Sequence, residues 1–151
     1  MRVKVEFVPY LHSVGDVLRD VDAKGLVSET FLLVHGDLVC NVPLKDIVDK
    51  HKSIVKEDSD AIMTTLVRAC NPFHRCRDRC EEAIFALDKK SSRILSYDLV
   101  DSEQTKSASS LSASLFLKAP QIDIRFDLLD CQVDVCSPQV SPLFQFFYEK
   151  I

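Results

Sequence analysis

The chain has 151 residues, 46% of them hydrophobic and 28% charged, with a formal net charge of −4. These values suffice for one globular core, so they exclude a disordered or fibrous chain, and the acidic balance argues against direct nucleic-acid binding. No apolar run approaches the ~20 residues that cross a bilayer, and the N-terminus alternates charged and apolar residues, unlike a signal peptide. Six cysteines without a secretory signal predict free thiols. We therefore expect a cytosolic protein with no membrane contact.

The first two predicted elements are a strand and a helix. Residues 3–8 alternate between apolar and charged types, which favours a strand. Apolar residues recur at helical spacing over residues 14–24. Ser13 and Asp16 have the spacing of a capping box, and Gly25 suits the left-handed end of a helix.

The next three elements complete an alternating order. Residues 31–35 are a continuous apolar run, typical of a strand buried on both faces of a parallel sheet. Residues 43–57 carry an apolar stripe and predict a second helix that starts with a proline. Residues 61–67 favour another strand. The order strand, helix, strand, helix, strand implies right-handed crossovers and an α/β fold with a parallel sheet.

The second half of the chain follows a different pattern. Residues 83–87 and 93–97 read as two strands around a polar turn, which predicts a β-hairpin. Serine-rich residues 101–114 contain few large apolar groups, so we expect a flexible insertion there. Residues 122–126 and 131–136 alternate as strands do.

A last helix is predicted from Ser137 onward, and it is rich in aromatic residues. Core packing is the expected use of most of them, and an interface with a partner subunit is the alternative. The contact candidates are Phe144, Phe146, Phe147 and Tyr148.

Three segments resemble a known family. They are SVGDVLRDVDAK at 13–24, FLLVHGDLV at 31–39 and FDLLDCQVDVCSPQV at 126–140. In this order and separation they resemble the epsilon subunit of eukaryotic translation initiation factor two B. The N-terminal region of that subunit is similar to sugar-phosphate nucleotidyltransferases, which implies a Rossmann-like, mostly parallel sheet with helices on both faces.

The same resemblance implies a function. The exchange reaction, removal of GDP from translation initiation factor two, belongs in that family to a C-terminal helical-repeat domain that this chain lacks. What remains is expected to hold subunits together. Its partners are then the other subunits of the exchange factor and, through the complex, translation initiation factor two.

Nucleotidyltransferase activity needs a glycine-rich loop, because phosphates approach backbone N–H groups closely. The three glycines, Gly15, Gly25 and Gly36, are isolated and cannot form such a loop. We therefore expect neither catalysis nor a cofactor.

Two glycine–aspartate pairs are the candidate nucleotide-binding residues. Gly36 and Asp37 follow the predicted strand, where the related pyrophosphorylases place a magnesium-binding aspartate; a structural role after the strand is the alternative. Gly15 and Asp16 stand where those enzymes place a nucleobase-contacting turn, and a helix cap is the alternative.

A third candidate is the loop that holds Cys70, His74, Cys76 and Cys80, which are potential zinc ligands. Their spacing lacks the paired short knuckles of structural zinc sites, so reduced thiols on a basic surface loop are the expected reading. The loop's arginines are expected to be solvated, because acidic neighbours offset their charge.

These observations favour a single nucleotidyltransferase-like domain over residues 1–151 with an added β-hairpin, and we expect it to be incomplete at its N-terminus and at its C-terminus. Its expected role is a non-catalytic assembly or regulatory portion of the exchange factor. The rival reading is a sugar-nucleotide pyrophosphorylase-like domain that binds nucleotide through Asp37 and magnesium. Missing flanking elements would leave an unpaired sheet edge, so self-association is expected.

Overall fold

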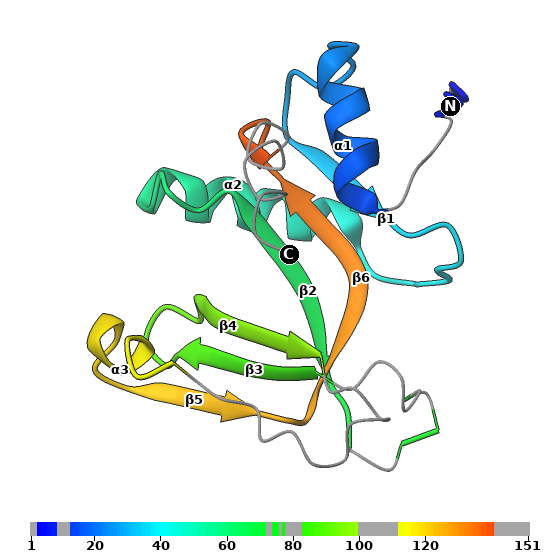
Figure 1. The fold of residues 1–151 in the computed structure, drawn as a ribbon. Helices are drawn as coiled ribbons and strands as arrows, with labels where there is room; N and C mark the ends of the chain where they lie inside the picture. The colour runs from blue at the N-terminus through cyan, green and yellow to red at the C-terminus, as the bar shows by residue number, and fades with distance from the viewer. Residues whose placement is uncertain are drawn as a thin grey trace. The chain divides into compact units, whose positions relative to one another are not determined.

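The computed structural model contains helices and strands in mixed order (Figure 1). It describes residues 3–8, 13–71, 74–75, 77, 83–99 and 112–140. The first part of the chain forms α1 (Val14–Ala23), β1 (Phe31–Val34), α2 (Leu44–Glu57) and β2 (Met63–Ala69). The later part forms β3 (Ala83–Asp88), β4 (Ile94–Leu99), α3 (Leu115–Lys118), β5 (Ile122–Arg125) and β6 (Leu128–Cys136). The α/β class is confirmed, and within the described ranges no helix has the length and apolar character to span a membrane.

The chain divides into two compact units, residues 1–65 with 132–151, and residues 66–131. Strands β2 and β6 each continue from one unit into the other. The prediction of one domain across the whole chain stays a prediction.

The first sheet has the strand order β1-β6-β2. β1 pairs antiparallel with β6, from Phe31 opposite Cys136 to Val34 opposite Val133. β2 also runs antiparallel to β6. At one end of this pair the Ser137 N–H donates to the Ile62 carbonyl at 2.8 Å, and at the other the Cys70 N–H donates to the Asp127 carbonyl at 2.7 Å. β1 and β2 are therefore parallel to each other, with β6 between them.

This topology changes two details of the predicted sheet. β1 is half-buried and lies at the edge, so the prediction that it is buried on both faces is wrong. The pairings with a resolved register are antiparallel. An apolar run does not specify whether the strand beside it runs parallel or antiparallel. Here the strand beside β1 is β6, which comes from the far end of the chain.

The strand predicted at residues 3–8 is also wrong, because this segment forms neither strand nor helix. Alternation supplies suitable side chains but no partner for the backbone hydrogen bonds. Three of its apolar residues, Val3, Val5 and Phe7, are exposed, and Val8 is half-buried.

The helix predictions are confirmed for α1 and α2. Ser13 and Asp16 form the complete capping box, and Gly25 takes a left-handed φ of 60° after the helix. Leu18 of α1 packs with Cys136 and Val140 in the core of the first unit, together with partly buried Phe31, Leu33 and Ile62. α3 was not predicted. It falls beside the serine-rich stretch, of which residues 101–111 lie outside the described part.

The second unit is built on the sheet β4-β3-β5. The predicted hairpin is present as β3 and β4, paired from Ala83 opposite Leu99 to Leu87 opposite Ile94. Phe85 is fully buried, and Tyr97 meets its ring edge-to-face at a centroid distance of 5.0 Å. Ala83, Phe85 and Leu128 form the core, with Val67 and Leu87 against them.

The alternation predicted for residues 131–136 is visible in β6. Val133 and Val135 are fully buried, while the intervening Asp134 is half-buried. The regular pattern begins after Gln132, whose φ of 55° is left-handed and rare inside a strand. Of the predicted final helix, Val140 is helical and buried, and residues 141–151 lie outside the described part.

The hairpin turn between β3 and β4 is held by Asp88. Its carboxylate accepts hydrogen bonds from the Ser91 N–H at 3.2 Å and the Lys90 N–H at 3.4 Å, and also from the Ser91 hydroxyl. The Ser91 hydroxyl is the main cause that lowers the pKa of Asp88. Ser92 follows with a left-handed φ of 59°.

We expect Ser92→Gly to stabilise the protein by up to about 1 kcal/mol, because glycine adopts positive φ without the steric cost of a Cβ. Ser91→Gly is the matched control, and it should destabilise because it removes the hydroxyl that bonds Asp88. Urea unfolding of the three proteins measures the difference. An equal response at both positions would contradict the role assigned to the turn.

Candidate functional site

The first candidate, the start of α1, is occupied by a helix cap. The Asp16 carboxylate accepts hydrogen bonds from the Ser13 N–H at 3.0 Å and the Ser13 hydroxyl at 3.2 Å, and it forms an ion pair with Arg19. The Asp16 N–H in turn donates to the Ser13 hydroxyl. These contacts satisfy backbone groups that a helix leaves unpaired at its N-terminus. The cap thus accounts for Asp16, and nucleotide binding by Gly15 and Asp16 stays a prediction.

The second candidate, Gly36 with Asp37, lies in a turn directly after β1, as the sequence predicts. Both residues are exposed, and the Leu38 N–H closes the turn on the His35 carbonyl at 3.4 Å. A Cβ placed on Gly36 meets no atom within 4 Å, so local packing does not require glycine there. The Asp37 side chain is therefore accessible to a ligand from solution.

No group of three or more histidine, cysteine or acidic side chains gathers as a metal site within the ranges that the structure describes. One carboxylate holds magnesium poorly without phosphate or additional oxygen ligands. The magnesium role of Asp37 therefore stays a prediction.

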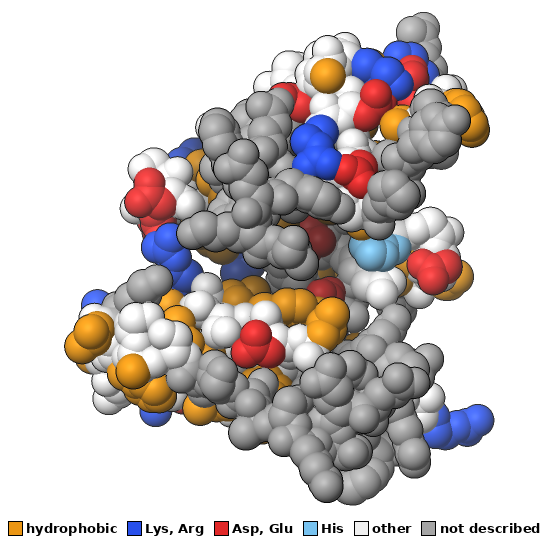
Figure 2. Space-filling view, in the orientation of Figure 1, with side chains coloured by type: hydrophobic (Ala, Val, Ile, Leu, Met, Phe, Trp, Pro, Cys, Tyr) orange, Lys and Arg blue, Asp and Glu red, His pale blue; other side chains and the backbone are white. Residues whose placement is uncertain are grey.

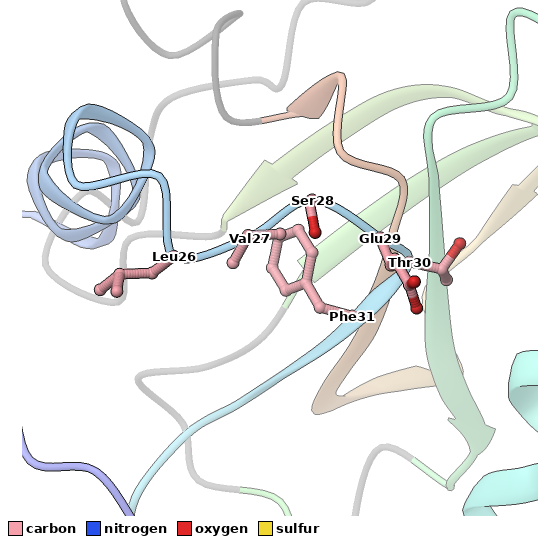
Figure 3. A pocket seen from close by; sticks show the side chains of 6 residues that line it. All are labelled: Leu26, Val27, Ser28, Glu29, Thr30 and Phe31. Atoms are coloured by element: carbon pink, nitrogen blue, oxygen red, sulfur yellow. The ribbon is translucent and has the colours of Figure 1, made fainter.

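A surface hollow of about 220 Å³ lies between α1 and β1 (Figure 3). Six consecutive residues line it: Leu26, Val27, Ser28, Glu29, Thr30 and Phe31. In Figure 3 the Phe31 ring lies beside Val27 and Ser28, whereas Glu29 and Thr30 project from the far end of the segment. Ligand sites usually collect polar groups from several elements. This hollow is formed by the single segment that connects α1 to β1, so it does not have the usual composition of a ligand site.

The described polar group with the deepest burial is His51 of α2, which is 1% exposed. Its Nδ1 lies 2.8 Å from the Thr64 hydroxyl of β2, and its Nε2 lies 3.0 Å from the Ser137 hydroxyl just after β6. One imidazole thus joins a helix and two strand ends. His51 follows Leu44, Ile47 and Val48 at helical spacing, so its burial agrees with its place on the apolar face of α2.

Burial lowers the pKa of His51 below its ordinary value, because a charged imidazole loses hydration inside the protein. The neutral ring can donate from one nitrogen and accept at the other, and a hydroxyl matches either role. Sequence gave no indication of Ser137 as a partner, since it lies 86 residues from His51. Only the fold brings them together.

The cysteine loop is described in part. Cys70 is buried and His74 is exposed, while Cys76 and Cys80 lie outside the described residues. The zinc site therefore stays untested.

Arg77 departs from the prediction of a solvated arginine cluster. Its guanidinium donates to the carbonyl oxygens of Phe126 at 2.7 Å and Leu128 at 3.0 Å. This side chain fixes its loop to the backbone before and within β6. The proposed interface residues Phe144, Phe147 and Tyr148 lie outside the described part of the chain.

Comparison with known proteins gives a consistent result. The chain is 42% identical over 141 residues to translation initiation factor eIF2B subunit epsilon of Schizosaccharomyces pombe, which covers 92% of this chain and 20% of that protein. It is 34% identical over 130 residues to the same subunit of Dictyostelium discoideum, covering 86% of this chain and 18% of that protein. No family model matches the chain.

By sequence, the chain is a relative of the eIF2B epsilon subunits. The resemblance first seen in three segments is confirmed, and it extends over most of the chain. The chain spans about a fifth of the length of these eIF2B epsilon relatives.

The cap gives a first test of the α1 residues. We expect Ser13→Ala and Asp16→Ala each to destabilise the protein by about 0.5–2 kcal/mol, because each removes one half of the capping box. Ser53→Ala is the control: Ser53 is exposed on α2 and bonds only to a backbone carbonyl of its own helix, that of Asp49. Alanine there should be neutral or slightly stabilising. Thermal unfolding of the three variants measures the effect, and equal shifts would refute the assigned cap.

The buried imidazole gives a second test. The pKa of His51 is lower in the folded state than in the unfolded state. The contribution of His51 to the free energy of unfolding is therefore complete above the unfolded pKa of about 6.5, and it is lost as the pH falls below that value. The free energy of unfolding should therefore rise between about pH 5 and pH 7.

His51→Gln should lower the free energy of unfolding by about 1–3 kcal/mol at neutral pH, and it should flatten the rise of that free energy with pH. His35→Gln, at an exposed position, should leave both unchanged. Urea titrations at several pH values provide the measurement. If the free energy of unfolding of His51→Gln still rises over this pH range, groups other than His51 cause the rise.

Proposed function

We propose that this chain is a non-catalytic assembly portion of the guanine-nucleotide exchange factor that acts on translation initiation factor two in the cytosol. The observation that carries the proposal is the similarity to eIF2B subunit epsilon over 141 residues. Two features of the described residues support a non-catalytic role. The carboxylate of Asp16, a candidate nucleotide-binding residue, is engaged in a helix cap, and the surface hollow at residues 26–31 is formed by a single connecting segment.

A nucleotidyltransferase-type fold, with a mostly parallel Rossmann-like sheet, is part of this proposal. It is supported by the relation between β1 and β2. These strands are parallel and are joined through α2, which is the arrangement of a strand-helix-strand crossover. β6, inserted between them, is the antiparallel member.

Assembly requires a surface that a partner can cover, and the second unit has suitable candidates. Edge strand β4 exposes apolar side chains, with Leu99 at 63%, and α3 exposes Leu117 at 89%. Figure 2 shows hydrophobic side chains on the surface of this unit. Others in the unit are Ile94, Tyr97, Phe116, Ile124 and Phe126. Exposed apolar groups in such number favour contact with another protein.

The test is a pull-down of the other eIF2B subunits with the tagged chain. We expect retention, and a loss of about five- to tenfold for Leu99→Glu or Leu117→Glu if these apolar side chains are contacts. Gln121→Glu is the matched control, since it adds one negative charge at an exposed polar position of the same unit. Failure of the unaltered chain to retain any subunit would contradict the proposal.

The rival function is nucleotide binding through Asp37 with magnesium. It is favoured by one observation, the exposed position of Asp37 at the end of β1 beside open space at Gly36. Calorimetry with nucleoside triphosphates and magnesium distinguishes the two functions. Saturable binding that is lost in Asp37→Ala and kept in Asp46→Ala, an exposed aspartate of α2, would establish the rival.

A further inference from the structure

The tip of the β3–β4 hairpin, residues 89–93, is basic although the chain as a whole is acidic. All of its residues are exposed, and three of them are cations: Lys89, Lys90 and Arg93. With the carboxylate of Asp88 beside them, residues 88–93 carry a formal charge of +2, whereas the whole chain carries −4. Such a local concentration of positive charge favours an acidic surface as its partner.

The two serines of this tip are held differently. The Ser91 hydroxyl donates to the Asp88 carboxylate and accepts from the Arg93 N–H at 3.3 Å. Ser92 is held through its backbone, because its N–H donates to the Asp88 carbonyl at 2.8 Å. Among the residues that the structure describes, none forms a hydrogen bond with the Ser92 hydroxyl. Ser92 therefore offers an exposed hydroxyl on a fixed backbone, with cations around it.

The residues before Ser92 have the order that basophilic serine kinases recognise. Lys89 and Lys90 stand three and two positions before it. Kinases of this class carry carboxylates beside the cleft that receives the acceptor serine, and these carboxylates form charge-assisted hydrogen bonds with cations at those two positions. Ser92 alone among the serines and threonines of the sequence has lysine or arginine at both positions.

We propose that Ser92 is a phosphorylation site for a serine kinase with an acidic substrate groove. The Ser92 oxygen forms a bond to the γ-phosphorus of ATP as the bond from that phosphorus to ADP breaks, and the hydroxyl proton passes to the catalytic aspartate of the kinase. The phosphate adds a charge of about −2, so the formal charge of residues 88–93 falls from +2 to about zero. Phosphorylation thus removes the basic character of the hairpin tip. This inference does not rest on the exchange-factor role.

Other serines that follow cations are less suitable acceptors. Ser53 also follows two lysines, but it lies inside α2 and its hydroxyl donates to the Asp49 carbonyl at 3.2 Å. Ser96 follows Arg93 by three positions, but it is half-buried inside β4. A kinase groove accepts a segment more readily at an exposed loop tip, because the backbone of a helix or strand is already engaged in hydrogen bonds. The hairpin tip, which lies between two strands, meets this requirement (Figure 1).

Phosphorylation of the folded chain tests the acceptor. The probe is the catalytic subunit of cyclic-AMP-dependent protein kinase with magnesium and ATP, and mass spectrometry measures and locates the phosphate that is added. We expect a single phosphate at Ser92. It should be lost in Ser92→Ala and retained in Ser91→Ala and Ser53→Ala. Circular dichroism verifies that each variant is folded before the kinase is added.

The two lysines test how the site is recognised. Lys89→Gln combined with Lys90→Gln should lower kcat/KM for phosphorylation by about tenfold or more, because two charge-assisted contacts with the kinase are lost. Lys45→Gln combined with Lys50→Gln is the matched control, since it removes the same charge from exposed positions of α2. The kcat/KM of this control should stay within about twofold of that of the unaltered chain.

Each of three outcomes overturns the proposal. One is a folded chain that gains no phosphate, whether or not a synthetic peptide of residues 86–97 gains it. Another is undiminished phosphate uptake by Ser92→Ala, which would assign the phosphate to a different residue. The last is an equal kcat/KM for the Lys89 and Lys90 double variant and its control, because it would show that the kinase does not recognise the cations before Ser92.

Discussion

The buried imidazole of His51 is the interaction on which the first unit depends. It bonds Thr64 on one side and Ser137 on the other, so α2 cannot shift without breaking a hydrogen bond to β2 or to the end of β6. The Ser137 N–H also donates to the Ile62 carbonyl, which fixes the same strand end through the backbone. A buried polar group without its partners is costly, so this site favours a single arrangement of the three elements.

Several polar residues that could serve a ligand serve the chain itself. Asp16 completes a helix cap, Asp88 organises a hairpin turn, and Arg77 holds two backbone carbonyls. Asp16 and Asp88 satisfy backbone groups of their own helix end and turn, and Arg77 satisfies carbonyl oxygens before and within β6. Asp37 differs, because it lies exposed in the turn after β1.

The relation to eIF2B subunit epsilon and the structure bear on function at different levels. The similarity identifies the relatives, and the matched region makes up 20% and 18% of their lengths. The structure adds a set of exposed apolar side chains on the second unit. This surface could not be recognised from sequence alone, because exposure of an apolar residue is a property of the fold.

The sequence by itself determined the elements whose causes are local. The capping box at Ser13, the left-handed Gly25, the apolar stripe of α2 and the β3–β4 hairpin all depend on residues within one or two turns of the chain. The three family-like segments also needed no structure, since they could be read directly. What the tertiary structure decided is which strands meet. β6 pairs with β1 about 100 residues earlier in the chain, whereas residues 3–8 pair with none of the described strands. Hydrophobic alternation specifies a surface that can be buried, but the choice of neighbour comes from the packing of the whole unit.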